Sequence, residues 1–136
     1  MTLIRTIRVY LLTAIVFFAI DLLWLGVFAK EFYNRHLGHF LSDSVNWPAA
    51  MAFYAIYIAG IMVFVIIPSL DADKTLSKTA LTGGFLGLFA YSTFDLTNYA
   101  LVEGWPFTVV WVDMIWGTGL TAAVSLISVG LSRRIL

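Results

Sequence analysis

The chain has 136 residues, of which 61% are hydrophobic and 12% charged, and its formal net charge is zero. A soluble domain carries about 25% charged residues and could not bury this much apolar surface, so the composition excludes an ordinary water-soluble protein. The balanced charge leaves no basic patch for nucleic acid, and the absence of cysteine excludes disulfides and thiolate sites.

Four apolar stretches follow one another along the chain, at about 9–28, 47–67, 79–101 and 107–131. Each has roughly the 20 residues that a helix needs to cross the hydrocarbon core of a bilayer. Backbone polar groups in lipid must be satisfied within the segment, so these stretches are predicted to be helices. The sequence therefore predicts an all-α polytopic membrane protein. We expect one domain over residues 1–136, with four transmembrane helices in an antiparallel bundle.

The connections between these helices have distinct characters. The longest, residues 29–46, mixes polar and aromatic side chains, which indicates a segment lying along the membrane interface. Pro68 is predicted to end the second helix. The sequence Gly104-Trp-Pro106 predicts a tight turn between the third and fourth helices. We expect the first stretch to remain an uncleaved span, because no signal-peptidase site precedes Lys30.

The orientation follows from the basic residues beside the helices. Six of the eight Lys and Arg residues lie near the N-terminus, between the second and third helices, or near the C-terminus. Only Lys30 and Arg35 lie on the other side. Because basic residues concentrate on the cytoplasmic side, both termini are predicted to be cytoplasmic.

Three aspartates interrupt the apolar stretches: Asp21, Asp95 and Asp113. Placing one carboxylate in the centre of a membrane helix costs about 2.5–3.5 kcal/mol on insertion scales, so each is expected to have a function. Each lies six or seven residues from the outer end of its predicted helix, about 9–11 Å deep at 1.5 Å per residue. We therefore predict one carboxylate layer in the outer half of the membrane, whose members are the candidate catalytic residues.

Aromatic and amide side chains share helical faces with these acids, at spacings of three or four residues. Trp24 follows Asp21, Trp116 follows Asp113, and Tyr91 and Asn98 flank Asp95. These four are the candidate substrate-binding residues, because the tryptophans offer faces to an organic cation and Asn98 can orient a ligand. The alternatives for the aspartates and tryptophans are hydrogen bonding between helices and an interfacial aromatic belt.

Three carboxylates in a low-dielectric layer cannot all be ionised without counter-charge, so they either share protons or hold a cation. Asp21, Asp95 and Asp113 are thus candidate ligands for a divalent cation, the one cofactor that the sequence suggests. His36 and His39 lie on the same side and could add nitrogen ligands, although an ordinary solvated loop is the favoured interpretation of these histidines.

The combination of Asp21-Leu-Leu-Trp24, Tyr91-Ser-Thr-Phe-Asp95-Leu-Thr-Asn98, Trp105 and Asp113-Met-Ile-Trp116 resembles a family over nearly the whole chain. This is the bacterial predicted-membrane-protein family known as domain of unknown function 2177. The resemblance implies a four-helix protein of the bacterial inner membrane and carries no activity or assigned residues.

Three functions remain open from the sequence. The first is a pocket that binds or processes a membrane lipid or small molecule at the acidic layer. The second is a small proton- or cation-coupled transporter, acting as a homodimer. The third is a non-catalytic assembly or sensory subunit whose acids pair with basic residues of a membrane partner protein.

Overall fold

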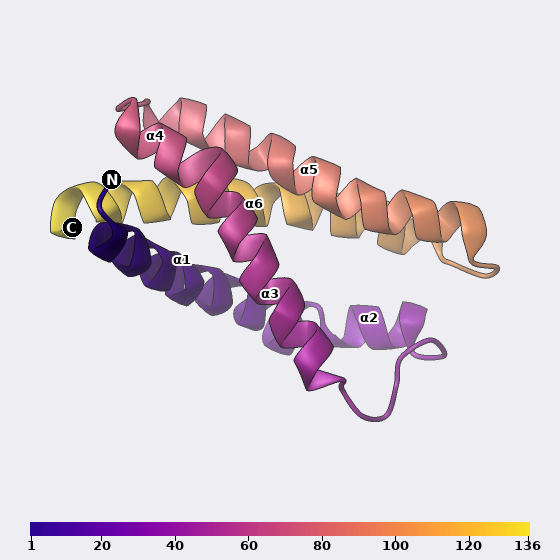
Figure 1. Ribbon diagram of the computed structural model, residues 1–136. Helices are drawn as coiled ribbons and strands as arrows, with labels where there is room; N and C mark the ends of the chain where they lie inside the picture. Colours follow the sequence, from indigo (N-terminus) through magenta and orange to yellow (C-terminus); the bar gives the residue numbers. More distant parts are fainter.

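The computed structural model describes all residues 1–136, and the chain is entirely helical, with no strand (Figure 1). The all-α prediction is confirmed. In chain order, with η marking a π-helical turn, the elements are α1 (Leu3–Leu23), η1 (Trp24–Phe28), α2 (Lys30–Leu37), α3 (Trp47–Ile61), η2 (Met62–Ile66), α4 (Ile67–Asp71), α5 (Leu76–Leu101) and α6 (Phe107–Ile135).

Polar side chains begin three of these helices. The side-chain oxygens of Thr2, Asn46 and Thr75 each accept a hydrogen bond from the backbone N–H three residues later, before α1, α3 and α5. Between α5 and α6 the predicted tight turn is present, and Gly104 adopts φ = +80°, a conformation that few other residues tolerate. Local sequence thus sets where the helices start and where the last hairpin turns.

The elements α3, η2 and α4 form one continuous rod, so the prediction that Pro68 ends this helix is wrong. Pro68 lies in the first turn of α4, and the helix continues to Asp71. A proline lacks the N–H that an α-helix needs, but the π-helical turn η2 immediately before it has already altered the hydrogen-bond ladder. The proline is therefore accommodated without ending the rod.

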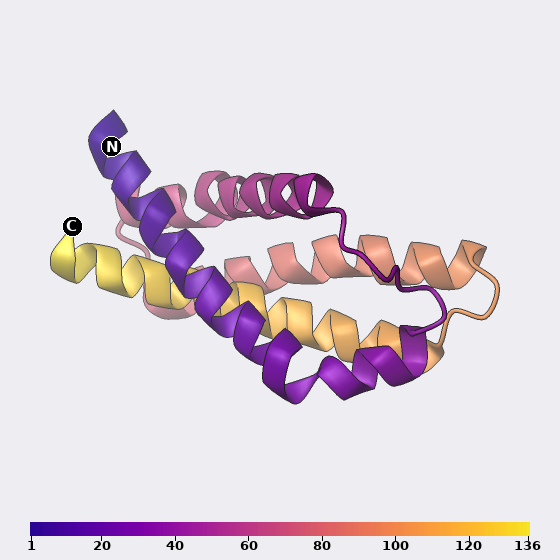
Figure 2. The ribbon, with the colours of Figure 1, turned by 90° about the horizontal axis from the view of Figure 1, so that it is seen from below.

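The chain turns so that its two termini lie at the same end of the molecule (Figures 1 and 2). The turn from α4 to α5 also lies at this end, which we call the termini end. The helix α2 and the turn from α5 to α6 lie at the opposite end, which we call the α2 end. Successive long helical segments, namely α1–η1, α3–η2–α4, α5 and α6, therefore run in alternating directions between the two ends.

The closest packing joins α5 to α6, which run antiparallel. Small residues permit this approach: a Cβ atom on Gly87 would overlap the carbonyl oxygen of Gly117, and one on Gly83 would come within 2.5 Å of the Ser125 hydroxyl. Next to this hairpin, α1 packs on α6, and the core gathers around buried Phe17, Ile61 and Leu120.

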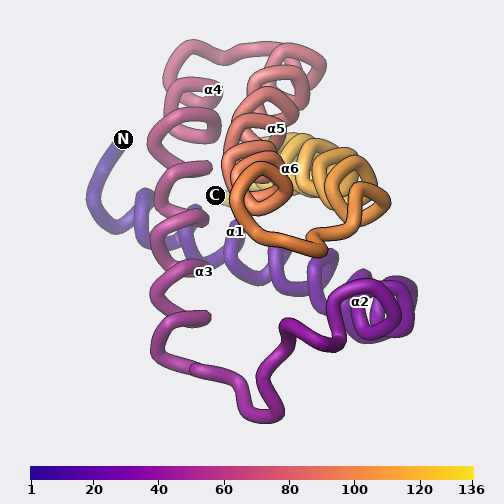
Figure 3. The backbone as a smooth tube through the Cα atoms, turned by 90° about the vertical axis from the view of Figure 1, so that its right-hand side faces the viewer, coloured from indigo at the N-terminus to yellow at the C-terminus, as the bar shows by residue number.

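The rod of α3 stands apart from α5 near the α2 end. It contacts α1 along part of its length, while α5 reaches the rod mainly at η2, nearer the termini end. Figure 3 looks roughly along α5 and α6, and shows α3 diverging from them toward Trp47. The α2 end is therefore more loosely closed than the termini end.

Three helical segments are long and apolar enough to cross a membrane: Leu3–Phe28, Trp47–Asp71 and Phe107–Ile135. With 26 residues α5 is also long enough, but it is not one of the three, since polar side chains such as Asp95 and Asn98 interrupt its apolar character. The structure thus supports a membrane protein with several apolar helices, and the role of α5 is taken up below.

Candidate functional site

All three predicted aspartates are buried inside the protein. The exposed fractions are 5% for Asp21 on α1, 0% for Asp95 on α5 and 9% for Asp113 on α6. Each lies six or seven residues from the end of its helical segment at the α2 end. None of the three points outward toward the surroundings of the bundle.

Two of these aspartates line one cavity. Asp21 and Asp113 face a space of about 370 Å³, within the range of roughly 300–1,000 Å³ typical of small-molecule sites. The remaining lining residues are apolar or aromatic: Leu25, Tyr33, Phe53, Tyr54, Tyr91, Phe94 and Trp116. We call this space the acidic cavity.

Each cavity carboxylate accepts one hydrogen bond from a tyrosine. The Tyr33 hydroxyl donates to Asp113 Oδ1 at 2.7 Å, and the Tyr54 hydroxyl donates to Asp21 Oδ2 at 3.3 Å. No Lys or Arg forms an ion pair with either acid. The two ion pairs of the protein both lie at the termini end. The Trp116 side chain is a further hydrogen-bonding neighbour of Asp21, and the Asp95 carboxyl group is one of Asp113, so neither acid has a basic partner.

The donor to Asp113 comes from the connection between the first two long helices. Tyr33 lies on α2, and its hydroxyl also accepts a hydrogen bond of 3.3 Å from Trp24 Nε1. Burial, and then the neighbouring Asp113 carboxylate, raise the pKa of the Tyr33 hydroxyl above its ordinary value of 10.0. The phenol therefore stays protonated and remains a hydrogen-bond donor at physiological pH.

Asp95 lies outside the cavity lining. Its buried carboxyl group lies within hydrogen-bonding reach of that of Asp113, and no other side chain donates to its oxygens. Two adjacent carboxyl groups in a dry environment are not both ionised, so a proton shared between them is the simplest arrangement. The structure brings Asp95 to the cluster, although a molecule in the acidic cavity would not touch it.

The predicted substrate-binding residues divide into two groups. Tyr91 and Trp116 line the acidic cavity. Trp24 stacks behind Trp116, with ring centroids 4.3 Å apart and an angle of 11° between the planes, and so supports the wall instead of forming it. Asn98 is half-buried and lines neither the acidic cavity nor the cavity beside it. Its contact with a ligand stays a prediction.

No group of three or more His, Asp and Glu side chains is placed to hold a metal ion together. His36 Nδ1 instead lies 2.9 Å from the carbonyl oxygen of Phe32, and the ring of His39 lies against Phe40 at 4.0 Å. These positions give no support to the prediction that His36 and His39 add metal ligands to Asp21, Asp95 and Asp113. Proton sharing between the acids is the arrangement that we consider below.

A second cavity of about 330 Å³ adjoins the first. It is lined by Phe53, Ala90, Tyr91, Phe94 and Asp113, so four of its five lining residues also line the acidic cavity. Phe53 on α3 and Phe94 on α5 are 51% and 53% exposed. These two rings therefore form the mouth of the joined cavities, between the diverging rods.

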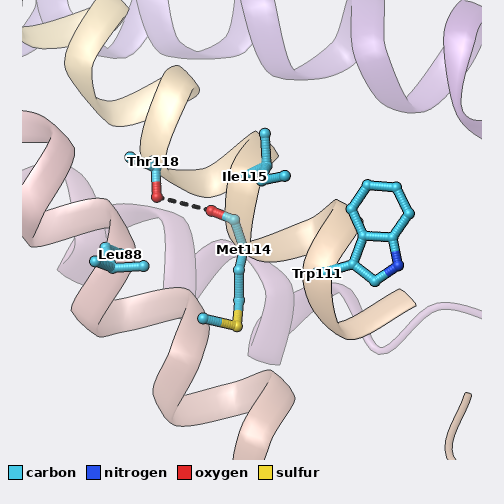
Figure 4. A pocket seen from close by; sticks show the side chains of 5 residues that line it. All are labelled: Leu88, Trp111, Met114, Ile115 and Thr118. Carbon is cyan, nitrogen blue, oxygen red and sulfur yellow. Dashed lines mark hydrogen bonds between the residues drawn. The ribbon is translucent and has the colours of Figure 1, made fainter. Parts of the chain in front are cut away.

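A different groove lies on the outer face of the α5–α6 hairpin (Figure 4). Its lining is Leu88, Trp111, Met114, Ile115 and Thr118, and the only polar side chain, Thr118, donates its hydroxyl to the Met114 carbonyl oxygen at 2.8 Å. The other four lining residues are hydrophobic and none is titratable, so this groove is not a candidate for acid–base chemistry.

Sequence reasoning missed the tyrosine donors. Tyr33 belongs to the segment 29–46 predicted to lie along the interface, and Tyr54 to the second apolar stretch, which contains none of the three aspartates. The signal was present in both cases: Tyr33 follows Phe32 in a polar segment, and Tyr54 and Tyr57 are the polar side chains of their helix. A buried carboxylate requires donors, so these hydroxyls were the available candidates.

Comparison with known protein families matches residues 6–130 to the family described as "Predicted membrane protein (DUF2177)". The chain belongs to this family. The resemblance seen in the sequence is thereby confirmed, and the protein is a membrane protein of the DUF2177 family. No curated protein and no solved structure gives a match.

Proposed function

We propose that this DUF2177 protein binds a lipid or a small membrane-dissolved molecule in the acidic cavity. The observation that supports this most strongly is that Asp21 and Asp113 line one roomy, mostly aromatic cavity without a basic partner. Keeping two such acids inside apolar helices is costly, and hydrogen bonds between membrane helices average only about 0.6 kcal/mol, which offsets little of that cost. A bound molecule provides the missing compensation.

The proposed setting is the bacterial inner membrane, with four spans and both termini in the cytoplasm. The fourth span is α5, which packs antiparallel to α6 and would have to accompany it through the bilayer. In this topology the cavity lies in the outer half of the membrane. Because the native chain has no cysteine, single cysteines can test it. Glu103→Cys should react with an impermeant maleimide added to whole cells, and Lys74→Cys should react only after lysis; the opposite pattern would reject the topology.

Binding is tested on the purified protein. We expect a molecule to co-purify in stoichiometric amount from mild detergent, detectable by native mass spectrometry. Asp21→Asn and Asp113→Asn keep the side-chain size and remove the charge, so each should lose that molecule. Asp43→Asn changes an exposed loop residue and is the matched control. A wild-type protein that carries nothing, or variants that carry the same molecule equally well, would reject the proposed function.

The same geometry defines the roles in any reaction on the bound molecule. Asp21 and Asp113 reach the cavity and would act as its acid and base, whereas Asp95 lies next to Asp113 outside the lining and would adjust the number of protons on the pair. The aromatic walls would exclude water. Of the three predicted catalytic residues, Asp21 and Asp113 are therefore proposed to contact the bound molecule, and Asp95 is proposed to act through Asp113.

Proton-coupled transport is the second candidate function, because Asp95 and Asp113 form a neighbouring pair of buried acids without a basic partner. A cationic substrate arriving beside this pair would displace its shared proton. In proteoliposomes, substrate-driven proton movement that disappears in Asp95→Asn would favour transport. Ligand binding without proton movement would favour a binding or catalytic protein.

A further inference from the structure

The acidic cavity also indicates what kind of molecule fits it. We propose that the ligand is an amphiphilic amine: an ammonium group that sits between Asp21 and Asp113, attached to a hydrocarbon chain that leaves through the mouth at Phe53 and Phe94. This inference rests on the proposed function and adds the chemical class of the ligand.

The first argument is the charge of the site. Neither cavity acid has a basic partner, and the fully buried Asp95 lies next to Asp113, so the cluster is rich in acid and contains no base. The nearest basic residues in sequence to Tyr33 are Lys30 and Arg35, which are exposed and form no ion pair. A phosphate or a carboxylate would be repelled here, whereas a cation neutralises the cluster.

The second argument is the chemistry of the walls. Aromatic rings supply most of the lining, namely Tyr33, Phe53, Tyr54, Tyr91, Phe94 and Trp116. Ring faces attract an ammonium group, by about 0.5–1 kcal/mol where solvent is present and by about 2 kcal/mol or more where it is excluded. No three His, Asp or Glu side chains are grouped to surround an inorganic cation, whereas the aromatic rings already line the space that an ammonium group would enter. The lining therefore favours an organic cation.

The third argument is the shape. The adjoining cavity of about 330 Å³ has Asp113 as its only charged lining residue, with Phe53, Ala90, Tyr91 and Phe94 around it. It continues the acidic cavity toward the half-exposed rings of Phe53 and Phe94. A polar head in the first space and an apolar chain in the second match these two linings. The molecule would come from the bilayer.

Two probes that differ only in the head group test the inference. Oleylamine and oleyl alcohol are added at equal mole fraction to the full-length protein in uncharged micelles, and binding is followed by native mass spectrometry. We expect a one-to-one oleylamine complex at least tenfold tighter than that with the alcohol. The double variant Asp21→Asn/Asp113→Asn should lose this preference, and Asp43→Asn should retain it.

A second variant guards against misfolding of the double variant. Phe53→Leu removes a half-exposed ring at the mouth and no charge, so the fold should persist. Because both probes pass their chains through this mouth, the two affinities should fall together and the preference for oleylamine should remain. Equal, aspartate-dependent binding of both probes would overturn the ammonium inference and leave the proposed function intact. If neither probe binds and no native molecule co-purifies, both fail. Oleylamine binding that is unaffected by the double variant also overturns the inference.

Discussion

The hydroxyl of Tyr33 is predicted to hold α2 on the bundle. Tyr33→Phe keeps the ring but removes the 2.7 Å hydrogen bond to Asp113 and the acceptor for Trp24 Nε1. A hydrogen bond to a charged group contributes about 1.5–3 kcal/mol, and each 1.4 kcal/mol is a factor of ten in an equilibrium constant. Local opening of α2 should therefore become about ten- to a hundredfold more frequent.

Amide hydrogen exchange measures this opening directly. Peptides covering residues 30–37 should exchange about ten- to a hundredfold faster in Tyr33→Phe, while peptides from α5 and α6 should change little. The matched control is Tyr99→Phe, since Tyr99 is about half exposed and its hydroxyl has no hydrogen-bond partner. Unchanged exchange over 30–37, or acceleration spread equally over the whole bundle, would refute the idea that this hydroxyl anchors α2.

Three further predictions concern stability. Gly87→Ala should lower the free energy of unfolding by about 1–3 kcal/mol, because the added Cβ would overlap the facing helix α6. The control is Gly119→Ala, whose Cβ would enter open space and should not lower it. Equal thermal stabilities of the two variants would contradict the close packing of α5 on α6. Tyr57→Phe loses a 2.6 Å hydrogen bond to Thr121 and should cost about 0.5–1.5 kcal/mol in denaturant unfolding. Arg133 donates to the carbonyl oxygens of Ser69 in α4 and Lys74 in the α4–α5 turn, so Arg133→Ala should hasten trypsin cleavage at this turn. An unchanged cleavage rate would contradict this role.

The helices could be predicted from the sequence because lipid leaves the backbone few options and the caps are local. Thr2, Asn46 and Thr75 accept their hydrogen bonds within one turn, so neighbouring residues decide these starts. The continuation through Pro68 could not be foreseen, because it depends on the π-helical turn η2, whose hydrogen-bond register has no simple sequence pattern. The helix α2 was not predicted either, because its eight residues are too few and too polar for a transmembrane helix.

The aspartate cluster was predictable because the distance from a helix end sets depth, and Asp21, Asp95 and Asp113 share that distance. Which side chains donate to them was not predictable, because it depends on how α2 and α3 lie across the bundle. Asn98 shows the same limit: it shares a face with Asp95 in projection, but the cavity lies on the Asp113 side of the pair. The spacing of polar residues predicts which face of a helix they share, but the packing of the helices decides which of these residues line a cavity.

The position of the mouth has a thermodynamic consequence. A molecule that passes between Phe53 and Phe94 arrives from the surrounding leaflet, so its effective concentration is its mole fraction among the lipids and not its molarity in water. Diluting the buffer would then leave occupancy unchanged, whereas adding inert lipid or detergent would lower it. Affinities for this protein are accordingly best expressed per lipid, and titrations at different detergent levels would differ systematically.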